Sequence, residues 1–352
     1  MKGVYVADVG DGLCINICMI FGGSILIDCG SQESNQVALD GLMRILHPFQ
    51  GIDVFVLSHF HVDHYNGLLH ASIGWKDWIS PIRQVYYPRI PEFKEKEEFI
   101  ADLCAMNLII FGSETGVMEY DLLKAISRIN RGQPFFHKAI SKGEIIDVDS
   151  SIFEILWPPQ MIDKGTLTVI KRAIEDFHNA MEQDIEARRL YEYVKDEGIF
   201  RKYIKEEAYK KEVETYRDID LPREKEQKRE LSKSVKKANN SLKKAANHLS
   251  LAFFEDNRFL FLGDAKNQEV KQIVDCLKTK NRKNFYTLVT PHHGTYWSES
   301  LKGIQCIYSI TSNGNRLHSL MKPYFKSISK RSFATYVNGD VAIPVHLQDS
   351  YL

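Results

Sequence analysis

Short apolar runs separated by turn residues fill the first sixty residues. The stretches "GVYVADVGDG", "LCINICMIFGG", "SILIDCGS" and "IDVFVLSH" each hold a run rich in β-branched residues and bounded by Gly or Asp. Such runs predict strands. Between the third and fourth runs, residues 36–47 place apolar side chains at helical spacing and predict a helix.

The same alternation continues through most of the chain. Further strands are predicted in "RQVYYP", "KGEIIDV", "SIFEILWPP", "FYTLVTPHHG" and "CIYSITS", with a hairpin in "LSLAFFEDNRFLFLGD" and a helix in "EYDLLKAISRIN". Strands with helices between them predict a layered mixed α/β (α+β) domain.

Residues 163–246 have a different pattern. Apolar residues recur there at alternating three- and four-residue steps, which is typical of two long helices that pack along one seam. We therefore predict a helical arm at 163–246, coiled-coil-like, inserted into a domain formed by residues 1–162 and 247–352. The seam residues are Leu167, Ile170, Ile174, Phe177 and Met181, then Leu231, Val235, Ala238, Leu242 and Ala245.

Composition narrows the class of protein. The chain has 352 residues, 44% hydrophobic and 26% charged, which excludes a fully disordered chain. Lys+Arg and Asp+Glu both number 46, so the net charge does not point to nucleic acid. No apolar run reaches 18 residues and the N-terminus lacks a signal-peptide pattern, so we expect no membrane partner. Six cysteines without secretion signals predict reduced thiols and a cytoplasmic location.

The strongest chemical signal is "SHFHVDH", directly after the apolar run "VFVLS". It places His59, His61, Asp63 and His64 within six residues. Imidazole and carboxylate groups that converge at a rigid strand end are typical of a metal site. Two more predicted strands end in similar residues: Asp264 in "FLGDA", and His292 and His293 in "TPHHG".

Together these motifs resemble the metallo-β-lactamase fold superfamily. The likeness extends to the metallo-β-lactamase-like domain of ComEC-type DNA-uptake proteins, through "ADVGDG", "LIDCGS", "LSHFHVDHYNGL", "FEILWPP", "NHLSLAFF", "FLGDA", "TPHHGT" and "SNGNRLHSL". It covers nearly the whole chain except the helical arm. It implies an αβ/βα sandwich with a long helical hairpin inserted after "WPP".

The resemblance also implies a ligand set for two divalent metal ions, Zn²⁺ first and Mn²⁺ as the alternative. His59 and His61 would bind the first ion, and Asp264 would bridge the two. His248, in "NHLS", either completes the first ion's ligands or only flanks the strand. The second ion would take Asp63, His64 and His293.

The reaction implied by this ligand set is hydrolysis by a metal-bound hydroxide at a dinuclear site. Asp63 would orient the hydroxide and accept its proton, and His318 would act on the leaving oxygen. Two features depart from the family pattern: Leu13 replaces an acid near the N-terminus, and Ser319 replaces the proline after the late histidine.

Three functions stay open at this point. The ComEC-like resemblance favours a phosphodiesterase or nuclease acting on nucleic acid or a nucleotide. A hydrolase of a carboxylic ester, thioester or lactam is the first alternative, and an apolar pocket without phosphate-binding cations would favour it. The second is a non-enzymatic, partner-binding component.

The helical arm gives the last set of expectations. Residues 223–244 hold nine Lys/Arg against three Glu, so this stretch either contacts a nucleic-acid backbone or is a solvated helix face. The seams indicate self-association, a protein partner or a lid over the metal cleft. If the arm is separate, deleting residues 163–246 should leave a folded, metal-binding core.

Overall fold

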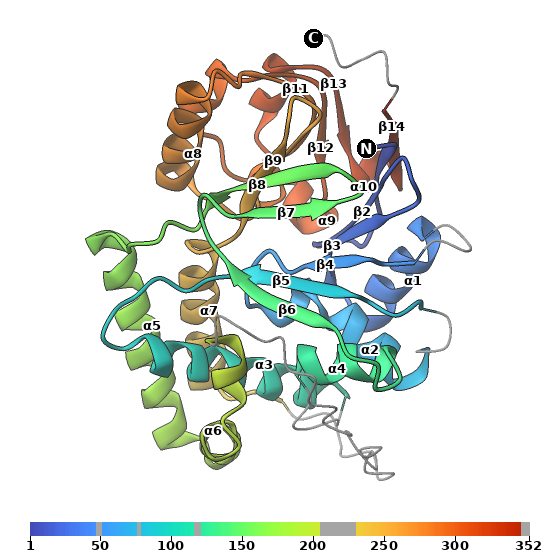
Figure 1. Ribbon diagram of the computed structural model, residues 1–352. Helices are drawn as coiled ribbons and strands as arrows, with labels where there is room; N and C mark the ends of the chain where they lie inside the picture. Colours follow the sequence, from blue (N-terminus) through green and yellow to red (C-terminus); the bar gives the residue numbers. More distant parts are fainter. Residues whose placement is uncertain (47–50, 76–78, 116–120, 205–229, 346–352) are drawn as a thin grey trace.

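The computed structural model describes residues 1–46, 51–75, 79–115, 121–204 and 230–345. Its strands form two seven-stranded sheets, which lie one above the other in Figure 1. The first sheet has the order β14-β1-β2-β3-β4-β5-β6, and the second has the order β13-β12-β11-β10-β9-β8-β7. The strands of the first sheet are β1 (Gly3–Val6), β2 (Gly12–Cys18), β3 (Ser24–Ser31), β4 (Val54–Val56), β5 (Gln84–Pro88), β6 (Phe136–Ile140) and β14 (Val341–Pro344). Those of the second are β7 (Ile145–Val148), β8 (Ser151–Trp157), β9 (Ala252–Glu255), β10 (Phe259–Phe261), β11 (Asn284–Val289), β12 (Gln305–Thr311) and β13 (Ser329–Ala334).

Alternation along the strands explains how the sheets stack. Ile25 and Ile27 of β3 belong to the hydrophobic core between the sheets, whereas Leu26 packs on the helical side. The second sheet repeats this arrangement: Phe253 faces the central core and Phe254 faces a third cluster of buried side chains. Because successive side chains point to opposite faces, each sheet buries both of its faces.

Helices cover the two outer faces and complete the predicted sandwich. The described helices are α1 (Asn35–Ile45), α2 (Asn66–Gly74), α3 (Lys96–Thr115), α4 (Leu122–Ile129), α5 (Lys164–Gln183), α6 (Ile185–Asp196), α7 (Lys233–Asn247), α8 (Asn267–Thr279), α9 (Asn315–His318) and α10 (Thr335–Asn338). Short 3₁₀ helices are η1 (Val62–His64), η3 (Ile199–Tyr203), η4 (Pro291–Gly294), η5 (Glu299–Gly303) and η6 (Pro323–Ser327). Helices α1–α4 lie on the first sheet and α8 lies on the second, which confirms the αβ/βα sandwich (Figure 1).

The parallel strands bring distant motifs to one edge. Pairing is parallel from β3 through β6 and from β10 through β13, and antiparallel elsewhere in both sheets. The carboxyl ends of parallel strands share one edge of their sheet. The segments that follow β4, β10 and β11 carry three of the predicted motifs: "HFHVDH", Asp264 in "FLGDA", and "PHHG".

The described part of segment 163–246 packs on the sandwich. Helices α5 and α7 lie against each other, and α6 and η3 lie against α3 (Figure 1). Seam residues such as Phe177 and Leu242 are buried in the same hydrophobic cluster as Phe99 of α3. The division into two units and the long hairpin stay predictions, because residues 205–229 lie outside the described residues.

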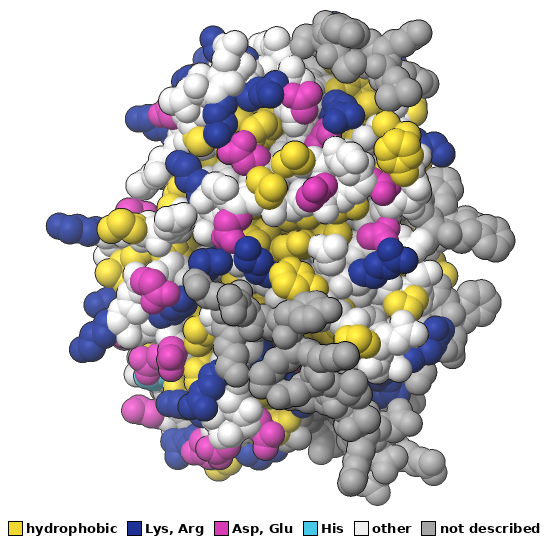
Figure 2. All heavy atoms as spheres, viewed as in Figure 1, with side chains coloured by type: hydrophobic (Ala, Val, Ile, Leu, Met, Phe, Trp, Pro, Cys, Tyr) yellow, Lys and Arg dark blue, Asp and Glu magenta, His cyan; other side chains and the backbone are white. Residues whose placement is uncertain are grey.

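The face turned to the viewer in Figure 2 mixes hydrophobic and charged side chains over β7 and β8. These strands expose Ile145 and Ile152, each by about half of its surface. Among the helices that the structure describes, none combines the length and the low polarity needed to cross a bilayer.

A buried carboxylate on α3 predicts a pH-dependent stability. Asp102 is fully buried, neither of its oxygens has a hydrogen-bond partner, and Nε2 of His178 lies 3.8 Å away. Burial raises the pKa of Asp102 to about 7, so the folded state loses stability as the pH rises from about 4 through 7. Asp102→Asn should therefore raise the free energy of unfolding at pH 8 by up to about 4 kcal/mol, and by much less at pH 5. Urea denaturation at both pH values measures this.

The exposed Asp196 on α6 supplies the matched control. Asp196→Asn should leave both denaturation curves within about 0.5 kcal/mol of the wild-type curves. Equal effects of Asp102→Asn at pH 5 and pH 8 would contradict the burial of a titrating carboxylate.

Candidate metal centre

The motif after β4 forms the floor of the site. Strand β4 ends at Val56, and the chain then turns through His59 and His61 into η1, which carries Asp63 and His64. All four side chains are buried. The ring centroids of His59 and His64 are 3.9 Å apart, and that of His61 lies 6.3 Å from His59. The structure thus brings the four residues together at the end of a strand.

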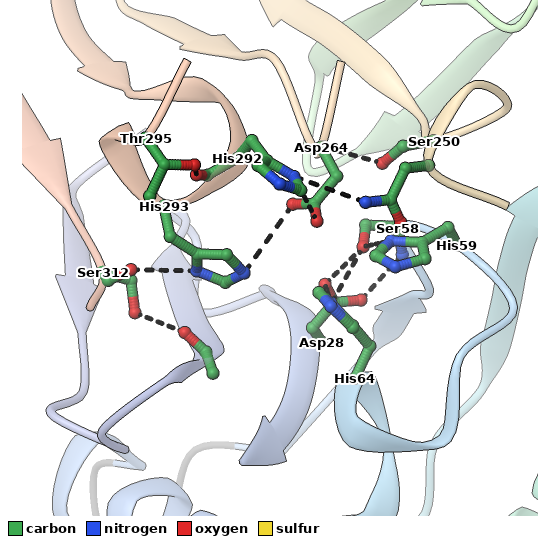
Figure 3. Close-up of polar contacts among 12 residues, drawn as sticks. Asp28, Ser58, His59, His64, Ser250, Asp264, His292, His293, Thr295 and Ser312 are labelled. Atoms are coloured by element: carbon green, nitrogen blue, oxygen red, sulfur yellow. Dashed lines mark hydrogen bonds and ion pairs between the residues drawn. The ribbon is translucent and has the colours of Figure 1, made fainter. Parts of the chain in front are cut away.

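Asp28 on β3 fixes this turn, and the sequence analysis had not assigned it a role. Its Oδ1 accepts a hydrogen bond from the backbone N–H of Ser58 at 2.7 Å, and its Oδ2 accepts one from the Ser58 hydroxyl at 2.5 Å. The same Oδ2 lies 2.7 Å from Nδ1 of His64 (Figure 3). A carboxylate on one ring nitrogen orients the other nitrogen toward a metal. The sequence feature that could have indicated this role is the position of Asp28 directly after the apolar residues of "SILID".

Burial and charge act in opposite directions on these histidines. Burial lowers the pKa of His59 and of His61 well below the usual value, so both rings are neutral and have a free lone pair. Burial also lowers the pKa of His64, but the Asp28 carboxylate outweighs it and the pKa is raised.

The second sheet contributes a carboxylate and two histidines. Gly263, at φ +50°, lets the chain turn after β10, where a Cβ would lie 2.4 Å from the Leu251 carbonyl oxygen. Asp264 follows, and its backbone N–H donates to the Ser250 hydroxyl at 2.9 Å. Its Oδ2 lies 2.9 Å from Nδ1 of His292 and its Oδ1 lies 3.8 Å from Nε2 of His293 (Figure 3).

The surroundings keep Asp264 ionised and His293 neutral. Burial would raise the pKa of Asp264, but His292 and His293 hold it well below the usual value. Burial lowers the pKa of His293, whose Nδ1 lies 2.9 Å from the Ser312 carbonyl oxygen. His292 had no assigned role in the sequence-based ligand set, yet it lies beside the proposed bridging carboxylate.

The donor groups converge and fit a divalent cation. One donor atom each from His59, His64 and Asp264 lies within 4.8 Å of the others, and all three residues are buried. Nε2 of His61 is buried without a hydrogen-bond partner, as expected of a nitrogen that binds a metal. Two imidazoles and a carboxylate suit Zn²⁺. This is a candidate metal site, which His61 and His293 adjoin.

Helix α7 supplies side chains to the other side of this cluster. Nζ of Lys243 lies 3.2 Å from Oδ2 of Asp63, whose Oδ1 lies against Nδ1 of His61. Nδ2 of Asn247, one turn later, lies 3.4 Å from Nδ1 of His292. Asp63 therefore contacts His61 and Lys243 in this structure.

Two predicted site residues have other partners. Nδ1 of His248 lies 2.7 Å from Oε1 of the buried Glu269 on α8, and its carbonyl oxygen accepts a hydrogen bond from Trp157 at 2.7 Å. His318 lies on α9, with its ring centroid 5.0 Å from that of Tyr336. None of the contacts described for these two histidines joins them to Asp264 or His59. Coordination by His248 and proton transfer by His318 stay predictions.

The N-terminal motif "GDG" holds α9 in place. Oδ1 of Asp11 accepts hydrogen bonds from the backbone N–H groups of Gly314 at 2.9 Å and Leu317 at 3.1 Å, and Oδ2 accepts one from Nε of Arg316 at 2.9 Å. Arg316 also acts electrostatically on Lys243, lowering its pKa. Leu13, in the same N-terminal segment, is buried in the central core.

Comparison with known proteins gives structural likenesses only. No protein-family model and no curated protein sequence matches the chain. The metallo-β-lactamase fold protein YhfI from Bacillus subtilis is similar over 98% of this chain and 100% of its own, with a TM-score of 0.44 and 9% identity. Tm1679, a metal-dependent hydrolase of the β-lactamase superfamily, is similar over 98% of this chain and 99% of its own, with a TM-score of 0.42 and 10% identity. A diphosphatase of the PhnP family is similar over 98% of this chain and 98% of its own, with a TM-score of 0.40 and 11% identity.

A subclass B3 metallo-β-lactamase from a soil metagenome, MEM-A1, is similar over 44% of this chain, with a TM-score of 0.26 and 16% identity. This chain spans about half, 49%, of that enzyme. All four TM-scores are below 0.5.

Proposed function

We propose that this protein is a metal-dependent hydrolase of phosphoesters, a phosphodiesterase or nuclease acting on nucleic acid or a nucleotide. One observation carries the choice of substrate: a cationic side chain, that of Lys243, lies beside the candidate metal centre. The Lys243 ammonium contacts Asp63. Burial, and next the charge of Arg316, lower the pKa of Lys243 to about 8.

The charges suit a phosphodiester better than an uncharged ester. A phosphodiester carries a negative charge on its non-bridging oxygens, which a metal ion and the Lys243 ammonium would share. An uncharged carboxylic ester or thioester would offer no negative charge to the Lys243 ammonium, whose side chain is mostly buried. The sequence-based criterion for such a substrate was a pocket without cations, so Lys243 supports the phosphoester.

The roles of the residues follow from their positions. A divalent ion held by His59, His64 and Asp264 would act as a Lewis acid on the phosphoryl group and activate water. We propose two such ions, Zn²⁺ or Mn²⁺, with His61, Asp63, His293 and His248 completing the ligands. Asp28, with Ser58, holds the ring of His64, while Asp63 accepts a proton at its carboxylate.

Hydrolysis assays test this proposal. The metal-loaded protein should cleave bis-p-nitrophenyl phosphate, single-stranded DNA or duplex DNA, and a chelator should abolish cleavage. Asp63→Ala should lower kcat/KM by about 10²- to 10⁴-fold, as expected for loss of a general base. Cleavage of p-nitrophenyl acetate or a chromogenic lactam, without cleavage of any phosphodiester, would contradict the proposal. Retained metal without hydrolysis of any substrate would favour a partner-binding role.

A further inference from the structure

Helix α7 has one apolar face and one face that points at the metal centre. Its residues Val235, Ala238, Leu242 and Ala245 are buried in the hydrophobic cluster shared with α3. Asn239, Lys243 and Asn247 follow one another at four-residue steps, so they share a different face of the helix. Lys243 and Asn247 each contact a residue of the candidate centre: Asp63 and His292, respectively.

Polar groups on this face of α7 still have hydrogen-bonding positions without a partner. Oδ1 of Asn239 is buried and has no hydrogen-bond partner. The Lys243 side chain is 29% exposed, and its ammonium has three hydrogens, of which Asp63 Oδ2 takes one. The charges that act on the Lys243 ammonium come from four elements or their ends: Asp63 on η1, Asp264 after β10, Arg316 on α9 and Glu114 on α3.

Three other lysines of α7 differ from Lys243. Nζ of Lys237 lies 2.6 Å from Asp176 of α5, and that of Lys236 lies 3.3 Å from Glu230. Lys244, the next residue in the chain, is exposed. Among these four lysines, Lys243 contacts an acid of the metal centre.

We propose that the polar face of α7 is the substrate-facing wall of the metal centre and that Lys243 binds a non-bridging oxygen of the substrate's phosphoryl group. This inference rests on the proposed function and names the residue that gives the site its preference for an anionic ester. It also assigns a part of the active site to the segment that the sequence had marked as a separate arm.

The experiment compares Lys243→Gln with Lys244→Gln, which removes the same charge one residue away on the exposed side. Both variants and the wild type are loaded with Zn²⁺, and their metal content is measured by mass spectrometry. Steady-state kinetics with bis-p-nitrophenyl phosphate give kcat and KM separately. Calorimetric titration with inorganic phosphate measures anion binding without turnover.

Lys243→Gln should raise KM and weaken phosphate binding by about 10- to 100-fold, the range of a hydrogen bond to a charged group. Its metal content should equal that of the wild type, and Lys244→Gln should match the wild type in every measurement. Lys243→Arg should keep most of the phosphate affinity, which would distinguish loss of charge from disturbed packing.

Other outcomes overturn the inference in distinguishable ways. If the wild type cleaves the phosphodiester and Lys243→Gln behaves like Lys244→Gln, the role of Lys243 is wrong and the proposed function stands. Loss of metal from Lys243→Gln would mean that this lysine supports the metal ligand Asp63 and not the substrate. If the wild type neither cleaves the phosphodiester nor binds phosphate, the proposed function and the inference both fail.

Discussion

Asp264→Asn should abolish metal binding at the cluster of His59, His64 and Asp264, and with it hydrolysis. Asp264 is the only carboxylate in that group of three, and its environment holds its pKa well below the usual value, so it is ionised at neutral pH. The amide has nearly the same shape but no negative charge to offset that of a divalent cation. Loss of an outer-shell partner typically costs about 10- to 100-fold in metal affinity, and loss of a direct ligand should cost more.

Two measurements check this result. Mass spectrometry after dialysis against Zn²⁺ gives the metal content of each variant. Thermal unfolding with added Zn²⁺ gives a second readout, because a ligand present at 100 times its Kd stabilises the native state by about 2.7 kcal/mol. The wild type should show this increase, and Asp264→Asn should not.

Asp275 on α8 provides the control, since its carboxylate is exposed and pairs with Lys278 on the surface. Asp275→Asn should bind Zn²⁺ as the wild type does. Unchanged metal content in Asp264→Asn would show that the cluster is not the metal site.

Deletion of residues 163–246 should unfold the protein, the reverse of what the sequence pattern led us to expect. Apolar side chains of α5, α6 and α7 are buried in one cluster with those of α3. Removing them would expose a large apolar surface on α3 and the helices around it, which favours aggregation. The deletion also removes Lys243 from the candidate metal centre.

Circular dichroism and size-exclusion chromatography of the deletion variant measure this outcome. Phe177→Ala gives a milder test in the full chain, because Phe177 is fully buried on α5 and the substitution should cost about 3–5 kcal/mol. Ile185→Ala on α6 is the control, since Ile185 is 85% exposed and the change should be nearly neutral. A deletion variant that melts cooperatively and binds Zn²⁺ would establish the separate arm.

Much of the architecture was predictable because strand and helix patterns are local. The alternation in β3 and in β9, and the seam of Ile170, Phe177 and Leu242, follow from the direction in which successive side chains point. The spacing in "HFHVDH" likewise brings His59, His61 and His64 together, because the three lie in one turn after a strand. ComEC-like specificity, the identity of the metal and the nucleic-acid partner stay predictions.

The sequence by itself thus determined the layers, the clustering of His59, His61, Asp63 and His64, and the apolar face of α7. Tertiary structure decided which distant residues complete the site: Asp28 against His64, His292 against Asp264, and Lys243 against Asp63. It also paired His248 with Glu269, a carboxylate on another helix. The physical reason is that periodicity fixes which way a side chain points from its own element, whereas the partner it meets depends on how the sheets and helices pack across the whole chain.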